Sequence, residues 1–544
     1  QYDTASAHYE PALAISQEIG DRRGEGIALH NLGLAHLDDL NDPAAALPWL
    51  QRARDAFDKL WDELTTDERR VSFGDTFTST GHALQRAHAR LEQPAAALEE
   101  AERARSRSFE LLLAQQRVAR GSATAAADSA AASEPVSCDA LLAAAERQRV
   151  TIVVFSQVLP SQLLAWVVRG GGAALTMKQI DVPSAETSVT QLIELTRRTI
   201  GARARQGEAT ARSAAEQANP SALAPPTVDE AALEEALAAR GGIKTLDDDD
   251  DDDDQATAAP TPAGRADPTT ELLRRCHELL IAPLGLVDGE PLLLVPDSDL
   301  FALPFAALLD ADGRHLIERH SLRVAPSVGT VIQLEEGLQA RAAPAKPSAL
   351  VVGDPAFHGW APQLPGAKAE AQDVAAALGA SAAFEAVATL IGDAATKPAV
   401  VEAMRRCDLV HLATHGVPDG VLLGGATMAE GKLSMGEVQS LELRARLVVL
   451  SECDSFRGKL SSDGVIGITR AFVAAGAPTL VASLWKVDDA ATRELMRRFY
   501  ARLLEGGAVG DATAAMQGAM VSMIRDERRS WSVLEWAAFV VYGL

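Results

Sequence analysis

Cysteine is scarce in this chain: only 4 of its 544 residues are cysteines, and they stand far apart, at positions 138, 276, 407 and 453. No two of them form a CxxC pair, which excludes the usual sequence patterns of a zinc-binding or dithiol redox centre. Sparse, unpaired thiols suit a reducing compartment, so we expect an intracellular, cytoplasmic protein. The sequence predicts neither a metal site nor a cofactor.

Long apolar runs and an excess of basic residues are also absent. No apolar stretch approaches the roughly 20 residues that a membrane-spanning helix needs. The first dozen positions have a helical pattern and show no signal peptide, and because Gln1 is not an initiator residue we expect a fragment of a longer chain. The 51 basic residues against 75 acidic ones leave a formal charge of -24. Phosphate binding relies on basic patches, so we expect neither nucleic acid nor a membrane as a direct partner.

An uninterrupted acidic run, Asp247 to Asp254, stands within a longer segment of unusual composition, residues 206–268. This segment is rich in Ser, Ala and Pro and cannot bury enough apolar surface to order itself. Blocks of like charge repel one another and stay solvated. We therefore predict a disordered acidic insertion inside a domain, and the alternative is a calcium-binding or partner-binding site.

The first 118 residues combine helical spacing with a repeated pattern of small residues. The pattern A-x3-Y-x2-A starts at Ala5 and returns 41 residues later at Ala46, with Leu in place of Tyr, and a third candidate starts at Ala97. Small residues at this spacing let paired helices pack closely, and the pattern resembles a tetratricopeptide-type array with a longer period. We expect helical repeats over residues 1–118 that hold a protein partner on a concave surface. An unrelated Ala-rich helical bundle is the alternative.

Residues 119–140 are rich in small residues and are predicted to be a linker, after which the pattern changes. Over residues 141–544 apolar strand-like segments such as VTIVVF (150–155), SALVVGDP (348–355) and PTLVASLW (478–485) alternate with helical segments. This alternation predicts an α/β domain with a largely parallel sheet sandwiched by helices. Right-handed connections then bring the carboxyl ends of the strands to one edge, where ligands bind in such sheets.

Two of the apolar segments end in residues with catalytic potential. LVHLATHG (409–416) ends in His415 and Gly416, and LVVLSECD (447–454) leads into Cys453. A free thiol is only a few per cent ionised at neutral pH, so a nucleophilic cysteine needs a nearby base, which His415 can supply if the strands are neighbours. The alternative is that Cys453 is a small buried residue at a strand end.

Several blocks in a fixed order resemble one family. They are VPDSDLFALPFAALLD (295–310), LVHLATHG (409–416), LVVLSECDS (447–455), DGVIGITRAFVAAGAPTLVASLWKVDD (463–489) and WAAFVVYG (536–543). Together they resemble the CHAT domain, a member of the caspase, separase and gingipain superfamily of cysteine peptidases that is commonly preceded by tetratricopeptide repeats. The resemblance spans roughly residues 140 to 544 and implies a caspase-like fold.

The resemblance also implies a function and a set of roles. His415 and Cys453 would form a catalytic dyad that cleaves protein substrates through a thioester, regulated by a partner on the repeats, and the backbone amides of Gly416 and Cys453 would stabilise the oxyanion. Glu452 stands where the family usually has a small residue. A carboxylate facing the cleft would raise the pKa of the thiol, whereas neighbouring residues on a strand face opposite ways. The alternative function is therefore a catalytically inactive scaffold for protein–protein interaction.

By analogy with the superfamily, the segment with Trp485, Asp488 and Asp489 is expected to line the substrate groove at this edge. The predicted substrate-binding residues are Asp454, Trp485 and Asp488. Asp488 has a second interpretation as the N-cap of the helix that follows it. His411 and His415 have the i, i+4 spacing of a zinc site on a helix, but the segment has a strand pattern. We therefore expect His411 to be a hydrogen-bonded core residue.

Overall fold

The structure is a computed structural model that describes residues 2–119, 136–171, 175–182, 188–200, 267–342, 344–417, 419–452, 458–461 and 464–544. Residues 120–135 of the predicted linker and 206–266 of the predicted acidic insertion lie outside these ranges. The same holds for Cys453 and Asp454. The predicted domain boundaries at residues 118 and 141 stay predictions.

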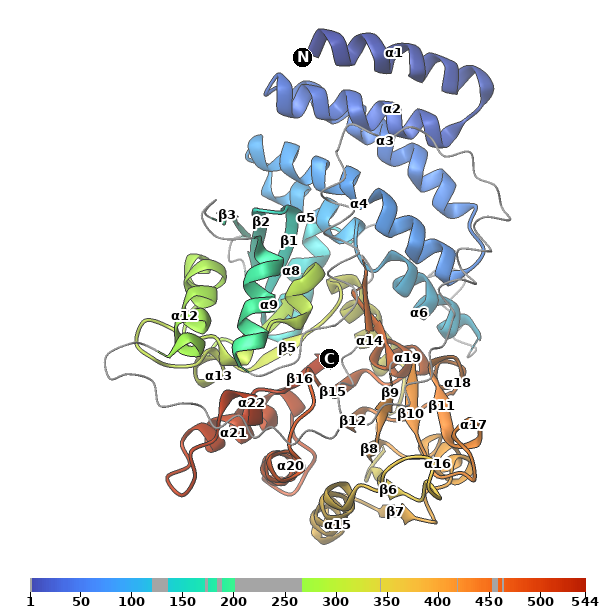
Figure 1. Ribbon diagram of the computed structural model, residues 1–544, viewed down its shortest axis with the longest axis vertical. Coiled ribbons are helices and arrows are strands. Elements are labelled where there is room, and N and C mark those ends of the chain that lie inside the picture. The colour runs from blue at the N-terminus through green and yellow to red at the C-terminus, as the bar shows by residue number, and fades with distance from the viewer. Residues whose placement is uncertain are drawn as a thin grey trace. The chain divides into compact units, whose positions relative to one another are not determined.

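The N-terminal region is helical (Figure 1). It contains α1 (Tyr2–Ile19), α2 (Arg22–Leu34), the π-helical turn η1 (Ala35–Asp39), α3 (Pro43–Asp62), α4 (Asp67–Arg90), α5 (Pro94–Arg103) and α6 (Arg107–Ala119). Asp21, Asp42 and Thr66 each precede a helix and accept a hydrogen bond from an amide of its first turn. These side chains satisfy donors that a helix start leaves without a partner.

The repeated small residues lie where these helices pack. Ala46, Leu50 and Ala53 of α3 are fully buried, and a Cβ on Gly33 of α2 would overlap the Leu50 side chain. The third candidate copy packs differently, because Ala97 of α5 is buried in a cluster with residues of the sheet that follows. Close packing through small residues is thus confirmed for α2 and α3, while α5 joins the helical region to the sheet.

The rest of the described chain is built on an 11-stranded sheet of order β3-β2-β1-β4-β5-β16-β15-β12-β8-β6-β7. Its strands are β1 (Thr151–Leu159), β2 (Gln162–Val168), β3 (Thr176–Asp181), β4 (Leu292–Val295), β5 (Leu322–Val324), β6 (Ser348–Pro355), β7 (Ala386–Gly392), β8 (Leu409–Ala413), β12 (Leu447–Ser451), β15 (Thr479–Ser483) and β16 (Phe539–Gly543). Only the β1–β2, β2–β3 and β15–β16 pairs are antiparallel. The prediction of a largely parallel sheet is confirmed.

Both faces of the sheet are covered, as continuous apolar strands require. On β1, Ile152 and Val154 pack in one cluster with α5, α8 (Cys138–Gln148) and α14 (Val328–Gln339). The alternate residues Val153 and Phe155 pack in the larger core with α9 (Val189–Thr199) and α12 (Pro268–Leu280). The alternation along a single strand therefore places helices on opposite sides of it.

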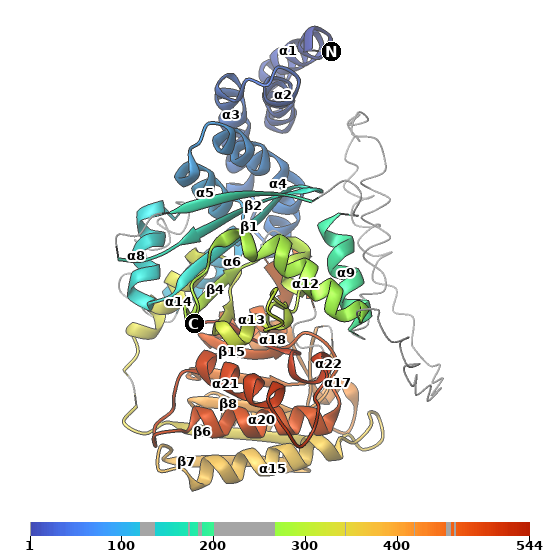
Figure 2. The same ribbon diagram turned by 90° about the vertical axis from the view of Figure 1, so that its left-hand side faces the viewer.

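Helices also cover the second half of the sheet. Figure 2 shows α15 (Pro365–Ala380) and α20 (Asp489–Leu503) side by side across β6 and β8, with α21 (Ala512–Ile524) beside α20. Other elements are α16 (Lys397–Met404), α19 (Ile468–Ala475), the 3-10 turns η2 (Ala282–Leu284), η3 (Ser298–Ala302) and η4 (Phe305–Ala307), and the short helices α13 (Leu316–Arg319), α17 (Met428–Gly431), α18 (Met435–Gln439) and α22 (Val533–Trp536). A small sheet is formed by β9 (Gly416–Val417), β10 (Gly420–Leu422) and β11 (Lys432–Ser434). A hairpin is formed by β13 (Gly458–Ser461) and β14 (Gly464–Gly467).

The closing segment WAAFVVYG contains a strand, as predicted: its last five residues form β16, which lies in the middle of the sheet. It pairs antiparallel with β15 over five residues, from Ser483↔Phe539 to Thr479↔Gly543, and parallel with β5 through Tyr542↔Val324. The C-terminal strand therefore joins the two halves of the sheet, a position that its apolar composition alone does not specify.

Candidate active site

The two segments that carry the predicted dyad lie on neighbouring parallel strands. β8 and β12 pair in register from Leu409↔Leu447 to Ala413↔Ser451, and β12 also pairs with β15. The carboxyl ends of all three strands therefore meet at one edge of the sheet. The expectation that the two strands are adjacent is confirmed.

His415 follows β8 at this edge, and its imidazole has a defined orientation. Its Nε2 lies 2.9 Å from the backbone oxygen of Pro362. A carbonyl oxygen can only accept, so Nε2 carries the proton and Nδ1 keeps the lone pair. The ring centroid lies 5.3 Å from that of Phe357. A half-buried imidazole fixed in this tautomer has a basic nitrogen available for a neighbouring acid.

Gly416 comes directly after this imidazole and begins β9. It pairs with Val421 of β10, while the amide of Leu422 donates to the backbone oxygen of His415 at 2.9 Å. The short sheet that starts here holds the backbone on both sides of His415. Gly416 therefore lies in ordered backbone next to the imidazole.

Asp489, the first residue of α20, belongs to the segment that was expected to line the substrate groove. A Cβ on Gly366, at the start of α15, would overlap the Asp489 carboxylate, so the two positions are in direct contact. Burial raises the pKa of Asp489, and the charges of Asp488 and Glu370 raise it further, while His415 acts in the opposite direction. Asp489 thus adds a carboxylate to the surroundings of the imidazole.

The residues expected to bind substrate have other contacts. Trp485 is 2% exposed, its indole N–H donates to the backbone oxygen of Leu534 at 2.9 Å, and the guanidinium of Arg197 lies 5.8 Å from its ring centroid. Burial in the core leaves Trp485 almost no surface to line a groove. Asp488 caps α20, because its carboxylate accepts from the amides of Ala490 and Ala491. Of the two interpretations of Asp488, the structure places it in the helix cap.

Glu452 lies at the end of β12 with its side chain inside the protein. It is 5% exposed, and neither carboxylate oxygen has a hydrogen-bond partner among the described residues. Burial raises the pKa of Glu452 well above its usual range. The hydroxyl of Ser483 on β15 donates to the backbone oxygen of Glu452 at 2.6 Å. This shift favours the neutral form of the carboxyl group, which would add no negative charge next to position 453.

The described cysteines have no features of a nucleophile. Burial raises the pKa of the thiols of Cys138 and Cys407, and it raises the pKa of Cys276 to about 11. A raised pKa lowers the thiolate fraction on which reactivity depends. By elimination, Cys453 is the one cysteine left as a candidate nucleophile, and it lies outside the described ranges.

His411 is a core residue, as expected. It is fully buried, and the Tyr500 hydroxyl lies 3.2 Å from its Nδ1. Within the described ranges, no cluster of three or more His, Cys, Asp or Glu side chains could hold a metal ion. The same part of the chain contains no helix long and apolar enough to span a membrane.

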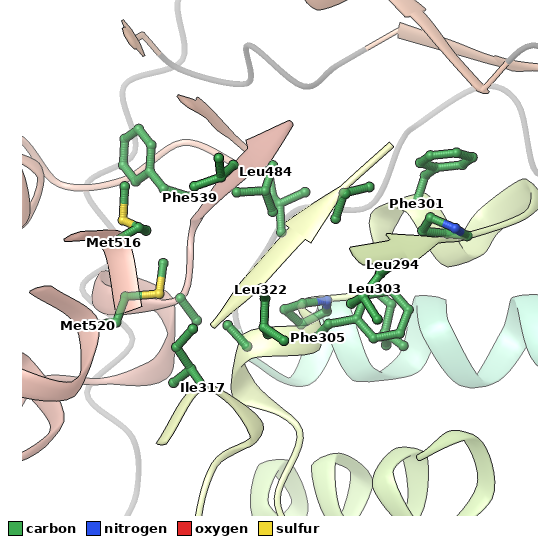
Figure 3. A pocket seen from close by; sticks show the side chains of 17 residues that line it. Leu294, Phe301, Leu303, Phe305, Ile317, Leu322, Leu484, Met516, Met520 and Phe539 are labelled. Carbon is green, nitrogen blue, oxygen red and sulfur yellow. The ribbon is translucent and has the colours of Figure 1, made fainter. Parts of the chain in front are cut away.

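A separate apolar pocket lies where β5 and β16 meet α21 (Figure 3). Phe301, Phe305 and Phe539 line it together with Met516 and Met520, and its other lining residues are also apolar. A pocket with no titratable or nucleophilic side chain offers no chemistry of its own. It also contains none of the predicted site residues, so the candidate site remains the edge formed by β8, β12 and β15.

Pro362 is the partner of His415 that sequence reasoning missed. Pro362 acts through its backbone oxygen, which carries no sequence signature. Asp489 was expected at this edge together with Asp488, but its interaction with His415 was not predicted. The Asp488 carboxylate caps the helix, whereas the charge of His415 affects the pKa of Asp489.

A helical repeat region followed by a large, mostly parallel sheet covered by helices, with a histidine at the carboxyl edge, defines the class of caspase-like α/β proteins. The chain belongs to the CHAT domain family, which matches residues 270–544, and residues 1–59 match the tetratricopeptide repeat. The family and fold predicted from the sequence are both confirmed.

Two curated relatives share part of this architecture. Tetratricopeptide repeat protein 28 of Homo sapiens is 29% identical over 332 residues, covering 50% of this chain and 13% of the human protein. The protein of the same name from Mus musculus is 27% identical over the same length, with the same coverage. The chain thus spans only 13% of the length of these relatives.

Among solved structures, the Saccharomyces cerevisiae separase-securin complex at 3.0 Å resolution resembles the chain with a TM-score of 0.51 and 12% identity. The match covers 92% of this chain and 37% of that one. At this level of identity, the similarity concerns the fold alone.

Proposed function

We propose that this protein is a cysteine endopeptidase in which Cys453 is the nucleophile and His415 the general base. The observation that carries the proposal is the orientation of His415, whose Nε2 donates to the Pro362 oxygen and whose Nδ1 keeps its lone pair, just after the strand that pairs with β12. This nitrogen can take the proton of a thiol that follows the neighbouring strand. Such a base is what a thiol needs to react at neutral pH.

The reaction proceeds in two stages. Nδ1 of His415 takes the thiol proton as the Cys453 sulfur attacks the carbonyl carbon of the scissile peptide bond. The tetrahedral intermediate carries an oxyanion, for which the amides of Gly416 and Cys453 are the proposed donors, each worth roughly 3 to 4 kcal/mol. Collapse breaks the C–N bond, and the leaving amine takes its proton from His415. Water, deprotonated by the same nitrogen, then hydrolyses the thioester and restores the thiol.

The helical repeats are the proposed binding region for a regulatory protein. Helices α4 and α6 are tied to the sheet domain, because Arg470 of α19 makes two hydrogen bonds to Asp67, at 2.9 and 3.1 Å, and one to Ser108 at 3.3 Å. The helix α19 begins directly after the hairpin of β13 and β14, which starts five residues beyond Cys453. A partner on the repeats can therefore act on the segment that follows the nucleophile.

The second candidate function is an inactive CHAT and tetratricopeptide scaffold for protein–protein interaction. The observation that favours it is Glu452, a buried carboxyl group directly before Cys453. If the Glu452 carboxyl group became exposed, it would ionise. A carboxylate raises the pKa of a nearby thiol, so it would make Cys453 a weaker nucleophile.

Cleavage experiments separate the two functions. Wild type and Cys453→Ala would be incubated with peptide libraries and with protein extracts, and new N-termini would be identified by mass spectrometry. The peptidase proposal predicts cleavage products that depend on the thiol. Products formed equally by both proteins would contradict it and favour the scaffold.

A further inference from the structure

Three polar side chains that the proposed mechanism does not use meet inside the core next to the site. His411 on β8, Glu370 on α15 and Tyr500 on α20 are each buried, with exposed fractions of 0%, 3% and 0%. The Tyr500 oxygen lies 3.2 Å from Nδ1 of His411, and Glu370 Oε1 lies 3.1 Å from Nε2 on the other side of the ring. One imidazole thus bridges two helices.

The chemistry of these contacts fixes the imidazole in its place. A carboxylate oxygen and an unprotonated ring nitrogen would repel each other, so the favourable tautomer has its N–H on Nε2, facing Glu370, although this contact lacks the alignment of a full hydrogen bond. Nδ1 is then the acceptor for the Tyr500 hydroxyl. Burial raises the pKa of Tyr500 well above its usual range, and the charge of Glu370 adds to this, so the hydroxyl stays protonated and remains a donor.

Full burial makes this arrangement specific. A buried polar group without a partner is costly, so each of the three side chains depends on the other two. If α15 or α20 shifted along the sheet, a buried donor or acceptor would lose its partner. A core filled only with aliphatic side chains would tolerate such a shift more easily.

The same three elements surround His415. His411 lies on β8, and His415 follows this strand, four positions after His411. The Pro362 oxygen that binds the imidazole precedes α15 by only three residues, and Asp489, whose pKa is affected by the charge of His415, is the first residue of α20. Asp489 also lies against Gly366 at the start of α15. The ends of α15 and α20 thus determine what the imidazole contacts.

We propose that His411 is a positioning residue: by joining Glu370 and Tyr500 it locks α15 and α20 onto β8 and so holds the Pro362 oxygen and Asp489 around His415. This inference rests on the proposed function, because it names what orients the base of that same site. A correctly oriented His415 keeps the Cys453 thiol ionised at lower pH. Without the contacts of His411 to Glu370 and Tyr500, the His415 imidazole can turn. The pKa of the Cys453 thiol then moves toward that of an ordinary thiol.

The rate at which iodoacetamide alkylates Cys453, followed by mass spectrometry from about pH 5 to pH 9, reports the thiolate directly. Tyr500→Phe removes one hydroxyl, and His411→Phe removes both contacts of the ring. Thr196→Val is the matched control, because it removes another buried hydroxyl, one that donates to Leu192 on α9. Unfolding temperatures would be measured for every variant, and His415→Ala gives the rate without the base.

The inference predicts that Tyr500→Phe and His411→Phe move the midpoint of the alkylation profile to higher pH and slow the reaction near pH 6.5 about three- to tenfold. Thr196→Val is expected to keep the wild-type profile. If Tyr500→Phe lowered the unfolding temperature but left the midpoint of the alkylation profile unchanged, the inference would be overturned. Because Tyr500→Phe removes only one hydroxyl, this test can be made even if His411→Phe does not fold. If the alkylation profile of wild type were the same as that of His415→Ala, the proposed function would be contradicted, and this inference with it.

Discussion

Ala413 of β8 is paired with Ser451 of β12, and these are the last residues of the two strands. His415 and Cys453 each follow these partners by two positions in the sequence. Parallel strands that end together deliver the residues after them to the same edge of a sheet. The register therefore supports the assignment of one histidine and one cysteine to a single site.

The buried carboxyl of Glu452 leads to a prediction about stability and pH. Its pKa is raised in the folded protein and near 4.3 in the unfolded chain. Above that value the unfolded state releases a proton that the folded state keeps, so stability falls as pH rises until the folded pKa is reached. Glu452→Gln removes this loss. We expect equal stability near pH 4 and a gain of roughly 1 kcal/mol per pH unit above it.

Urea unfolding of wild type and Glu452→Gln between about pH 4 and pH 8 measures this difference. Glu442→Gln is the control, because Glu442 is exposed and stands ten positions earlier. Parallel stability curves for wild type and Glu452→Gln would show that the carboxyl is not held neutral.

The contact between Arg470 and Asp67 predicts a measurable coupling between the helical repeats and the sheet domain. The Arg470 side chain is 9% exposed and its guanidinium lies 4.9 Å from the Phe109 ring centroid. Charge-assisted hydrogen bonds of this kind are worth about 1.5 to 3 kcal/mol. Arg470→Ala is expected to lower the free energy of unfolding by about that amount.

A double-mutant cycle with Asp67→Asn isolates the pair. Arg502→Ala, which removes an exposed pair with Glu505, is the control and should change stability by less than about 0.5 kcal/mol. Additive effects of Arg470→Ala and Asp67→Asn would contradict the coupling.

The close approach of β6 and α15 predicts opposite effects for two glycines. A Cβ on Gly353 would collide with the Cβ of Ala371 and lie 3.0 Å from the Ala367 oxygen. Gly353→Ala is therefore expected to destabilise the protein by about 1 to 3 kcal/mol. Gly379 lies on α15, and a Cβ at this position would meet open space. Gly379→Ala should therefore stabilise the protein by about 0.5 to 1 kcal/mol. Thermal unfolding checks both, and equal effects would refute this packing.

The described thiols are predicted to differ in reactivity. With a pKa of about 11, the Cys276 thiol is roughly 0.1% ionised at pH 8, and it is fully buried. Cys138 is partly exposed. A thiol reagent at pH 8 should label Cys138 slowly and Cys276 only after unfolding, as peptide mass spectrometry would show. Rapid labelling of Cys276 in the folded protein would contradict its burial.

Much of the fold could be predicted from the sequence, because apolar strands that alternate with helices leave few arrangements. The continuous run at Leu447 to Ser451 predicts a strand buried on both faces, and the strand pattern around His411 places that histidine in the core. The order of strands could not be predicted. Nothing in the apolar residues of β16 indicates that it inserts between β5 and β15.

The site was predictable where it depends on side chains at strand ends, as for His415 and Gly416. The rest depends on contacts between residues distant in the sequence. The Pro362 oxygen is a backbone group, and any residue could supply it. Trp485 was expected to bind substrate, yet its side chain is buried and its indole N–H donates to the backbone oxygen of Leu534, which is distant in the sequence.

The most direct test of the dyad is the rate of Cys453 alkylation near pH 6.5 in wild type and in His415→Ala. If His415 deprotonates the thiol, wild type should react at least about tenfold faster than the variant, with a midpoint clearly below the value of about 8.5 for an ordinary thiol. Equal rates, with both midpoints near that ordinary value, would contradict the assignment of His415 and Cys453 to one catalytic site.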